Sequence, residues 1–540
     1  MDFPLTLTPL LERAGKLFGK VEVVSRLPDK SLHRYTYADF YGRARRLAES
    51  LQKAGLQRGD RVATLMWNHY AHLETYFAVP AIGGVLHTLN LRLHPNEIAY
   101  IAKHAGDRFL VVDDVLLPLF EKFCGQVKFE RVIVVRHTAQ PVSGGFDDYE
   151  AFLDRATGNL RYPDLDENEA AAMCYTSGTT GMPKGVLYSH RALVLHTFAA
   201  IAPDGLALSQ RDVILPVVPM FHANAWGLPF AAAMTGCKII FPGPHLDPES
   251  LLDLCDGERA TFAGGVPTIW MGILGMLDKC PGRWTFTPGM RMLVGGSAVP
   301  EAMFRRFDQY GVRIIQGWGM TEMSPLGTVC NLKSYMADLS EDQRYAVRAK
   351  QGLPAPFVEI RAVGESGEVP WDGTSMGELQ VRGPWIASSY YNMPEESHRW
   401  TEDGWFRTGD VVTIDPEGYV KITDRTKDLI KSGGEWISSA TLEKLALGHP
   451  AVAEAAVIGV SHPKWQERPL LLVVPRKDRT IVRAELLDFI APHVPRWWLP
   501  DDVVSVERFP YGATGKIQKS VLRKQFADHK LPLDAARHKP

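Results

Sequence analysis

The hydrophobic pattern up to about residue 352 alternates between helical and strand spacing. Apolar side chains at Leu10, Leu11, Ala14, Leu17 and Phe18 fall on one face of a helix. Because strands that alternate with helices form parallel β-α-β units, this part of the chain predicts an α/β fold. The pattern predicts helices over residues 10–18 and 37–55, and strands at 21–24, 61–66, 108–112 and 170–174.

From about Gly352 the pattern changes to short strands separated by turns, and it changes again near Asp424. The last part predicts helices around 442–446 and over 484–489, with strands at 455–460 and 469–474. The predicted organisation is a large N-terminal domain over 1–423 with a small β-barrel-like subdomain at about 352–423, a hinge at 424–428 and a small α+β C-terminal domain over 429–540.

Composition is typical of a globular protein, because 45% of the 540 residues are hydrophobic and 23% are charged. The formal net charge of −2 gives no excess of positive charge for phosphate backbones, so nucleic acid is not expected as a partner. The six scattered cysteines include no CxxC pair, which argues against a disulfide scaffold or structural zinc and favours a reducing compartment. No secretory signal is visible at the N-terminus, so we expect a cytoplasmic protein.

Residues 213–237 form a run of 25 residues without a charge, which is long enough to span a bilayer. The run contains three prolines together with His222 and Asn224, which would leave polar groups unpaired in lipid. We interpret the run as buried protein interior, with a membrane span as the alternative.

A glycine- and hydroxyl-rich block, YTSGTTGMPKG at residues 175–185, directly follows the predicted strand at 170–174. Glycines allow backbone N–H groups to converge on an anion, while four Ser and Thr hydroxyls and Lys184 add donors and positive charge. Pro183 and Gly185 stand where a P-loop NTPase has glycine and Ser or Thr, which excludes that motif. The block therefore predicts a phosphate-binding loop, the alternative being a surface turn.

This block resembles the phosphate-binding loop of the adenylate-forming superfamily, which includes acyl-CoA synthetases, peptide-synthetase adenylation domains and firefly-type luciferases. Segments similar to four further family motifs follow in order, so the resemblance covers nearly the whole chain. Together with residues 218–226, they most resemble bacterial medium- to long-chain fatty acyl-CoA synthetases. The four segments are QGWGMTE at 316–322, WFRTGD at 405–410, DRTKDLIK at 424–431 and PYGATGK at 510–516.

The resemblance implies an AMP-forming acid–thiol ligase that uses ATP, Mg²⁺ and coenzyme A. A carboxylate would attack the α-phosphate of ATP to give acyl-AMP and pyrophosphate, and CoA would then displace AMP. In the family the C-terminal domain rotates between these two steps, which implies a mobile domain here. A homodimer is implied by the same analogy.

The resemblance also assigns catalytic roles. Thr321 would donate to the α-phosphate, and Glu322 and the Thr176 hydroxyl would hold Mg²⁺. Lys516 would bridge the substrate carboxylate and the α-phosphate during adenylation, and Lys427 occupies the matching hinge position. For Glu322 alone, the alternative is a solvated carboxylate at the start of a helix.

Further residues match the family's nucleotide-binding positions. Asp410 is the implied acceptor for the ribose hydroxyls, and Arg425 would assist at the ribose or phosphate. The segment 296–298 would form part of an adenine-binding wall, the alternative being an ordinary turn. The implied ATP- or AMP-binding residues are Thr176, Ser177, Gly178, Thr179, Thr180, Gly181, Lys184, Gly296, Ser297, Ala298, Gln316, Gly317, Trp318, Gly319, Met320, Thr321, Asp410, Arg425, Lys431 and Trp436.

Amino-acid-activating relatives place an Asp after the Phe of the motif at 218–226, whereas His222 follows Phe221 here. An amino acid substrate is therefore disfavoured, and the apolar neighbours favour an alkyl chain, because each buried methylene contributes about 0.8 kcal/mol. Trp226 resembles the gating aromatic of long-chain synthetases, the alternative being a core tryptophan. The implied acyl- and CoA-site residues are His222, Ala223, Trp226, Gly319, Pro325 and Gly433.

Other functions stay open from the sequence alone. A ligase for short-chain, branched or aryl acids, or an enzyme that loads a carrier protein, would share every nucleotide motif. A non-catalytic nucleotide-binding scaffold and a peripheral membrane protein are further alternatives. A nucleophile-elbow hydrolase is excluded, because the segment 295–299 lacks the closing glycine.

Overall fold

The computed structural model describes residues 2–138, 145–176, 182–432, 435–511 and 517–532. Residue contacts divide the chain into two compact units. The first unit comprises residues 1–176, 183–360 and 381–406, and the second comprises 177–182, 361–380 and 407–540.

A nine-stranded sheet forms one half of the first unit. Its central strands are parallel, and antiparallel strands complete both edges. The spatial order is β16 (Leu353–Pro354), β15 (Leu326–Val329), β14 (Arg313–Gly319), β13 (Arg291–Val294), β12 (Phe262–Gly265), β10 (Val213–Pro216), β11 (Lys238–Phe241), β1 (Glu22–Arg26) and β2 (Leu32–Thr36).

A seven-stranded sheet forms the other half of this unit. It is parallel except at the pair β8 and β9, which is an antiparallel hairpin. The order is β7 (Asp147–Asp148), β6 (Arg131–Val135), β5 (Asp107–Asp113), β3 (Arg61–Leu65), β4 (Val85–Thr88), β8 (Ala170–Tyr175) and β9 (Gly185–Ser189).

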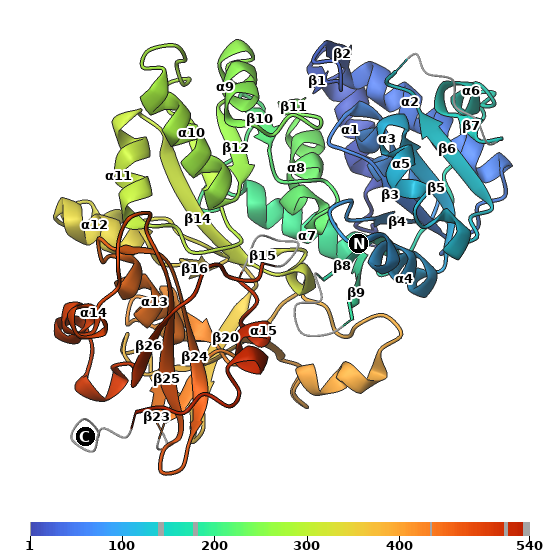
Figure 1. The fold of residues 1–540 in the computed structure, drawn as a ribbon. Coiled ribbons are helices and arrows are strands. Elements are labelled where there is room, and N and C mark those ends of the chain that lie inside the picture. Colours follow the sequence, from blue (N-terminus) through green and yellow to red (C-terminus); the bar gives the residue numbers. More distant parts are fainter. Residues whose placement is uncertain (1, 139–144, 177–181, 433–434, 512–516, 533–540) are drawn as a thin grey trace. The chain divides into compact units, whose positions relative to one another are not determined.

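Helices cover these two sheets, and α9, α10 and α11 pack on one face of the nine-stranded sheet around the buried Trp270 and Phe304 (Figure 1). Side-chain caps fix where several helices begin: at α2, Thr36 Oγ1 accepts a hydrogen bond from Asp39 N. The helices are α1 (Thr8–Leu17), α2 (Tyr37–Lys53), α3 (Tyr70–Ala81), α4 (Pro95–Ala105), α5 (Leu117–Phe120), α6 (Tyr149–Leu153), α7 (His190–Ile201), α8 (Leu228–Thr235), α9 (Pro248–Gly257), α10 (Pro267–Lys279), α11 (Glu301–Gln309) and α12 (Glu341–Arg348).

The second unit contains most of two smaller sheets. One has the order β18 (Gly367–Glu368), β17 (Glu359–Gly364), β19 (Gly377–Arg382), β20 (Phe406–Ile414) and β21 (Val420–Arg425). The other has the order β23 (Glu435–Ile437), β22 (Ile430–Ser432), β25 (Gln466–Pro475) and β24 (Val452–His462), with β26 (Asp502–Ser505) beside β25, and it packs against α13 (Ser439–Leu447), α14 (Arg483–Ile490) and α15 (Lys519–Gln525).

The structure confirms the predicted α/β fold, because each helix and strand expected from the hydrophobic pattern is present with bounds that shift by a few residues. The β-rich character beyond Gly352 is also confirmed. The domain limits at 423 and the hinge at 424–428 stay a prediction.

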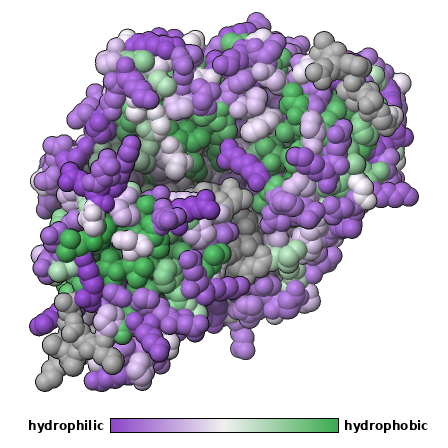
Figure 2. Space-filling view, in the orientation of Figure 1, coloured by the Kyte–Doolittle hydropathy of each residue, from purple (hydrophilic) through white to green (hydrophobic). Residues whose placement is uncertain are grey.

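The uncharged run 213–237 lies in the protein interior, as expected. It contains β10, a short turn and the eight-residue helix α8, and most of its side chains are buried. In the described part of the chain, no helix is both long and apolar enough to cross a membrane. Hydrophilic side chains cover much of the visible face (Figure 2).

Candidate active site

A tight turn between β14 and β15 carries Thr321 and Glu322. The two strands are antiparallel, and Met320 N donates to Pro325 O at 3.0 Å across the turn. Gly319 ends β14 in such close contact that a Cβ there would lie 1.8 Å from Pro325 O. Only glycine fits this position, because any side chain would collide with the returning backbone.

Side chains and backbone from distant segments hold this turn in place. The Tyr188 hydroxyl, on β9, donates to Thr321 O at 2.6 Å. Ala387 N donates to Glu322 O at 2.8 Å, and Ser324 Oγ donates to Trp385 O at 2.9 Å. The turn is therefore fixed by the hairpin β8–β9 and by the segment 385–387 together.

The Glu322 carboxylate is buried, with a relative exposure of 5% for the residue. The Tyr390 hydroxyl donates to Glu322 Oε1 at 2.5 Å. The pKa of Tyr390 is raised, mainly by burial and further by the negative charge of Glu322, so the phenol stays protonated and remains a donor. Among the described residues, Glu322 forms no ion pair with a lysine, arginine or histidine. A buried carboxylate that lacks a cationic partner fits a hard cation such as Mg²⁺, and the alternative of a solvated carboxylate is wrong.

Thr176 and Lys184 flank the glycine-rich block at the loop end of the hairpin β8–β9. Thr176 N donates to Lys184 O at 2.9 Å, and Lys184 N donates to Thr176 Oγ1 at 3.2 Å. Lys184 Nζ pairs with Glu396 Oε2 at 2.5 Å and lies 5.1 Å from the centroid of the Tyr390 ring. Tyr390 thus contacts the lysine through its ring and Glu322 through its hydroxyl.

The predicted adenine-binding residues lie within β14 or directly after β13, which are adjacent parallel strands. Gln316 on β14 lies opposite Val294 on β13, and Gly296 follows with φ +82°, a left-handed conformation that favours glycine. Ser297 and Ala298 are exposed. Gln316 is 1% exposed, and its Oε1 has no hydrogen-bond partner among the described residues. An unpaired buried acceptor fits a ligand that brings its own N–H donor.

A strained turn presents the predicted acyl-site residues. Ala223, Asn224, Ala225, Trp226 and Gly227 all have positive φ, a run that costs about 1–2 kcal/mol for each non-glycine residue. Such strain persists only where the surroundings impose it, and it often marks a functional segment. His222 is exposed and Trp226 partly buried.

In the second unit, Asp410 and Arg425 lie opposite each other on β20 and β21. Arg425 Nε is 2.5 Å from Asp410 Oδ1, and Asp410 is 1% exposed. Lys427 is exposed in the following turn, where its neighbour Asp428 pairs with Arg523 of α15. Lys431 and Trp436 face each other on β22 and β23.

Comparison with known protein families decides the identity of this arrangement. Residues 11–391 match the AMP-binding enzyme family, and residues 441–516 match the AMP-binding enzyme C-terminal domain. The chain belongs to the AMP-binding enzyme family. The predicted resemblance to adenylate-forming enzymes, with a large N-terminal and a small C-terminal domain, is thereby confirmed.

Two relatives of this AMP-binding enzyme align along nearly their whole length. A long-chain-fatty-acid–CoA ligase of Thermus thermophilus is 50% identical over 531 residues, which cover 98% of this chain and 97% of that protein. A medium-chain-fatty-acid–CoA ligase of Ectopseudomonas oleovorans is 44% identical over 531 residues, covering 97% and 96%. Among solved structures, ATP-bound MatB from Rhodopseudomonas palustris matches with a TM-score of 0.80 and 27% identity, covering 97% of this chain and 99% of that chain.

The predicted residues of this AMP-binding enzyme fall into three groups. Those of the first unit cluster around the turns and strand ends described above, with Gly317 and Pro325 partly buried and Trp318 buried beside them. Asp410, Arg425, Lys427, Lys431 and Trp436 belong to the second unit. Ser177, Gly178, Thr179, Thr180, Gly181, Gly433 and Lys516 lie outside the described residues.

The residues that hold Thr321, Glu322 and Lys184 belong to no motif in the sequence. Tyr390 and Glu396, which contact Glu322 and Lys184, precede the ribose motif in a segment without a recognised pattern. Tyr188, which bonds Thr321 O, lies in a strand whose pattern is that of ordinary core. The adjacent pair Tyr390–Tyr391 was the available signal, because tyrosine combines a large apolar ring with a hydroxyl that finds a hydrogen-bond partner when it is buried.

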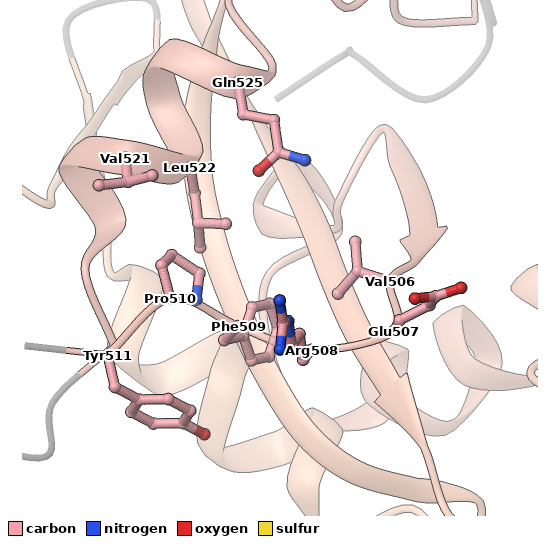
Figure 3. Close-up of a pocket in the computed structure, with 9 residues that line it drawn as sticks. All are labelled: Val506, Glu507, Arg508, Phe509, Pro510, Tyr511, Val521, Leu522 and Gln525. Carbon is pink, nitrogen blue, oxygen red and sulfur yellow. The ribbon is translucent and has the colours of Figure 1, made fainter.

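An open groove of 790 Å³ in the second unit lies beside the described start of the predicted lysine motif, Pro510 and Tyr511 (Figure 3). Tyr511 and Phe509 border it from one segment, and Leu522 borders it from α15. The lining residues are Val506, Glu507, Arg508, Phe509, Pro510, Tyr511, Val521, Leu522 and Gln525.

A second cluster, His69, Asp113 and His137, has the composition of a metal site. Asp113 Oδ1 accepts from His69 Nε2 at 2.8 Å and from His137 Nε2 at 3.1 Å. His69 Nδ1 accepts from Ala71 N at 3.2 Å, so its proton must sit on Nε2, which leaves no lone pair there for a metal. The cluster is therefore a hydrogen-bonded support for the start of α3.

Proposed function

We propose that this AMP-binding enzyme is a fatty acid–CoA ligase of the AMP-forming acid–thiol type. In the first step, a carboxylate oxygen attacks the α-phosphate of ATP, which forms acyl-AMP and releases pyrophosphate. In the second step, the thiol of CoA attacks the acyl carbonyl, which forms acyl-CoA and releases AMP. Medium- to long-chain fatty acids are the proposed substrates.

The buried Glu322 on its anchored turn is the observation that carries this proposal. The first step brings two anions together, so it needs positive charge and fixed donors near the phosphates. Glu322 and Thr176 would hold Mg²⁺, which supplies positive charge to the triphosphate when bound. Thr321 and Lys184 are placed on fixed backbone within the same unit, where they would donate to phosphate oxygens.

The substrate class is supported by two observations. The two relatives named above carry fatty acid–CoA ligase names and align over almost all of this chain. Trp226 and Ala223 lie on a strained turn next to α8, whose residues Leu228 to Met234 are all buried and mostly apolar. An alkyl chain gains free energy from such surroundings, whereas a substrate ammonium would find no carboxylate at His222.

Further residues would supply the remaining groups. Asp410 would accept hydrogen bonds from the ribose, with Arg425 beside it. Lys516 would contact the reacting carboxylate and α-phosphate, and Gly433 with Lys431 and Trp436 would contact nucleotide or CoA. Rotation of a C-terminal domain about 424–428, with Lys427 in the hinge, would exchange the two half-reactions.

A pyrophosphate-release screen tests the proposal. Purified protein is incubated with ATP, Mg²⁺ and acids from C2 to C18 or aryl acids, with and without CoA. We expect pyrophosphate release with medium- and long-chain fatty acids and acyl-CoA only when CoA is present. Release confined to aryl or short-chain acids, or acyl transfer to a carrier protein but not to CoA, would overturn it.

We further propose that the enzyme is a cytoplasmic homodimer. The proposal rests on analogy with related enzymes and on the scattered cysteines of a reducing compartment. Light scattering on the purified protein tests the oligomeric state, and cell fractionation with a carbonate wash tests whether the enzyme contacts membranes.

A further inference from the structure

His196 lies in the middle of α7 and is 1% exposed. Burial lowers the pKa of His196 to about 3, so the imidazole is neutral near pH 7. A neutral imidazole has one N–H donor and one acceptor nitrogen. The contacts of the ring decide which nitrogen plays each part.

One edge of the imidazole faces the turn that carries Thr321 and Glu322. Leu326 N, at the end of that turn, donates to His196 Nε2 at 3.2 Å. Trp385 Nε1 donates to Leu326 O at 2.8 Å, so both backbone groups of Leu326 are bound by side chains from distant segments. The Trp385 and His196 rings meet edge to face, with centroids 6.1 Å apart.

The adjacent Cε1–Nδ1 edge of the imidazole faces the strained turn at 223–227. A Cβ at Gly227 would lie 2.7 Å from His196 Cε1 and 2.9 Å from Nδ1, so glycine and imidazole are in direct contact. Gly227 follows Trp226, whose indole reaches the end of β13, 3.4 Å from where a Cβ at Gly295 would lie. The His196 imidazole therefore contacts the backbone at Gly227, which helps to set the direction of the Trp226 indole.

The tautomer follows from these contacts. Because Nε2 accepts from Leu326 N, the proton lies on Nδ1, at the edge that faces Gly227. Nδ1 has no hydrogen-bond partner among the described residues. A buried donor left unpaired is unfavourable, so the hydrogen bond from Leu326 N to Nε2 and the contact with Gly227 must hold the ring in this position.

We propose that His196 is a positioning residue that couples the Trp226 turn to the Thr321–Glu322 turn, so that chain-length selection and adenylation geometry depend on one buried imidazole. The proposal rests on the proposed function. A rigid planar ring between two backbone segments transmits a displacement of one segment to the other. A long acyl chain that displaces Trp226 would thus also shift Leu326 and the turn that precedes it.

The test compares His196→Leu with the wild type in two measurements. The first is the ratio of kcat/KM for octanoic over hexadecanoic acid in pyrophosphate release, which does not depend on the fraction of folded enzyme. We expect a shift of about fivefold, and little further shift when His196→Leu is added to Trp226→Ala, because coupled residues are not additive. His196→Gln, whose amide oxygen can accept from Leu326 N, is expected to restore part of the wild-type ratio.

His190 provides a matched control on the same helix. It is also fully buried, its pKa is lowered to about 4 by burial, and its Nδ1 accepts from Leu7 N at 3.2 Å. His190→Leu therefore removes an equivalent acceptor away from both turns. The proposal is overturned if His190→Leu shifts the ratio as much as His196→Leu, or if His196→Leu leaves it unchanged.

The second measurement is amide hydrogen exchange, which needs no substrate. His196→Leu is expected to speed exchange in peptides over both 320–327 and 223–228, whereas His190→Leu should affect the segment around Leu7. Faster exchange over 320–327 alone would contradict the coupling. If the wild type turned over no fatty acid, the proposed function would fall, while this measurement would still decide whether the two turns are coupled.

Discussion

A single phenol holds the carboxylate on which the proposed chemistry depends. Tyr390→Phe removes the hydroxyl that donates to Glu322 Oε1 without changing the ring that contacts Lys184. Hydrogen bonds to charged groups contribute about 1.5–3 kcal/mol, so we expect kcat/KM for pyrophosphate release to fall roughly tenfold or more. A higher Mg²⁺ concentration for half-maximal rate should accompany this loss.

Tyr391→Phe is the control, because Tyr391 is adjacent and its backbone N donates to Gly185 O. Tyr391→Phe should keep an activity close to that of the wild type. Equal losses in the two variants would show that the Glu322 contact is not what matters.

Buried neutral histidines make stability depend on pH. Burial lowers the pKa of both His72 and His196 to about 3, well below the value near 6.5 of an unfolded chain. Below pH 6.5 the unfolded state therefore binds more protons than the folded state. The free energy of unfolding has its highest value above pH 6.5 and falls as the pH drops toward 3. At pH 5, each histidine should lower the free energy of unfolding by roughly 2 kcal/mol relative to its value above pH 6.5.

Urea unfolding between pH 7 and 5 measures this dependence. His72 bonds Thr64 Oγ1 and Trp67 O, so His72→Gln removes a titrating group and keeps a polar side chain there. The variant should be less stable at pH 7. The slope of its free energy of unfolding against pH should be smaller by the equivalent of about one bound proton. An unchanged slope would mean that His72 is protonated in the folded state.

At the scale of the element, the turn between β14 and β15 depends on glycine. Gly319→Ala places a Cβ against Pro325 O, and the turn must open to accept it. We expect a loss of roughly 2–4 kcal/mol in the free energy of unfolding, together with loss of pyrophosphate release, since Thr321 and Glu322 move with the turn.

Gly275→Ala in α10 is the contrasting substitution, because a Cβ there meets nothing within 4 Å. Alanine in a helix interior is more favourable than glycine by about 0.5–1 kcal/mol, so this variant should be slightly more stable with unchanged activity. Urea unfolding and the pyrophosphate assay check both variants. A mild effect of Gly319→Ala would show that the turn adapts.

At the scale of the whole molecule, the proposed domain rotation predicts that the two half-reactions separate. Lys516→Ala should nearly abolish acyl-AMP formation while leaving the reaction of supplied acyl-AMP with CoA largely intact, because the lysine acts in the first step. Single-turnover assays of each half-reaction measure this. Lys524→Ala, an exposed lysine of α15, is the control and should leave both steps unchanged.

Comparable loss of both half-reactions in Lys516→Ala would count against a lysine that serves adenylation alone. It would equally weaken the idea that the C-terminal domain presents different faces in the two steps.

The sequence by itself determined the α/β fold, the order of the motifs and the chemical types at the site. Local hydrophobic period and glycine content suffice for this, because helices, strands and turns depend on neighbours along the chain. The helix at Tyr37–Lys53 and the strand at Ala170–Tyr175 appear where their patterns predict them. The family resemblance rested on the same local signals.

Only the tertiary structure decided what surrounds the reacting groups. Glu322 is bound by Tyr390, 68 residues away, and Leu326 by His196, 130 residues away. Sheet order and chain crossings bring such residues together, and neither leaves a periodic trace in the sequence. The left-handed run at 223–227 was hidden for the same reason, because surrounding packing, and not local preference, imposes positive φ on Ala, Asn and Trp.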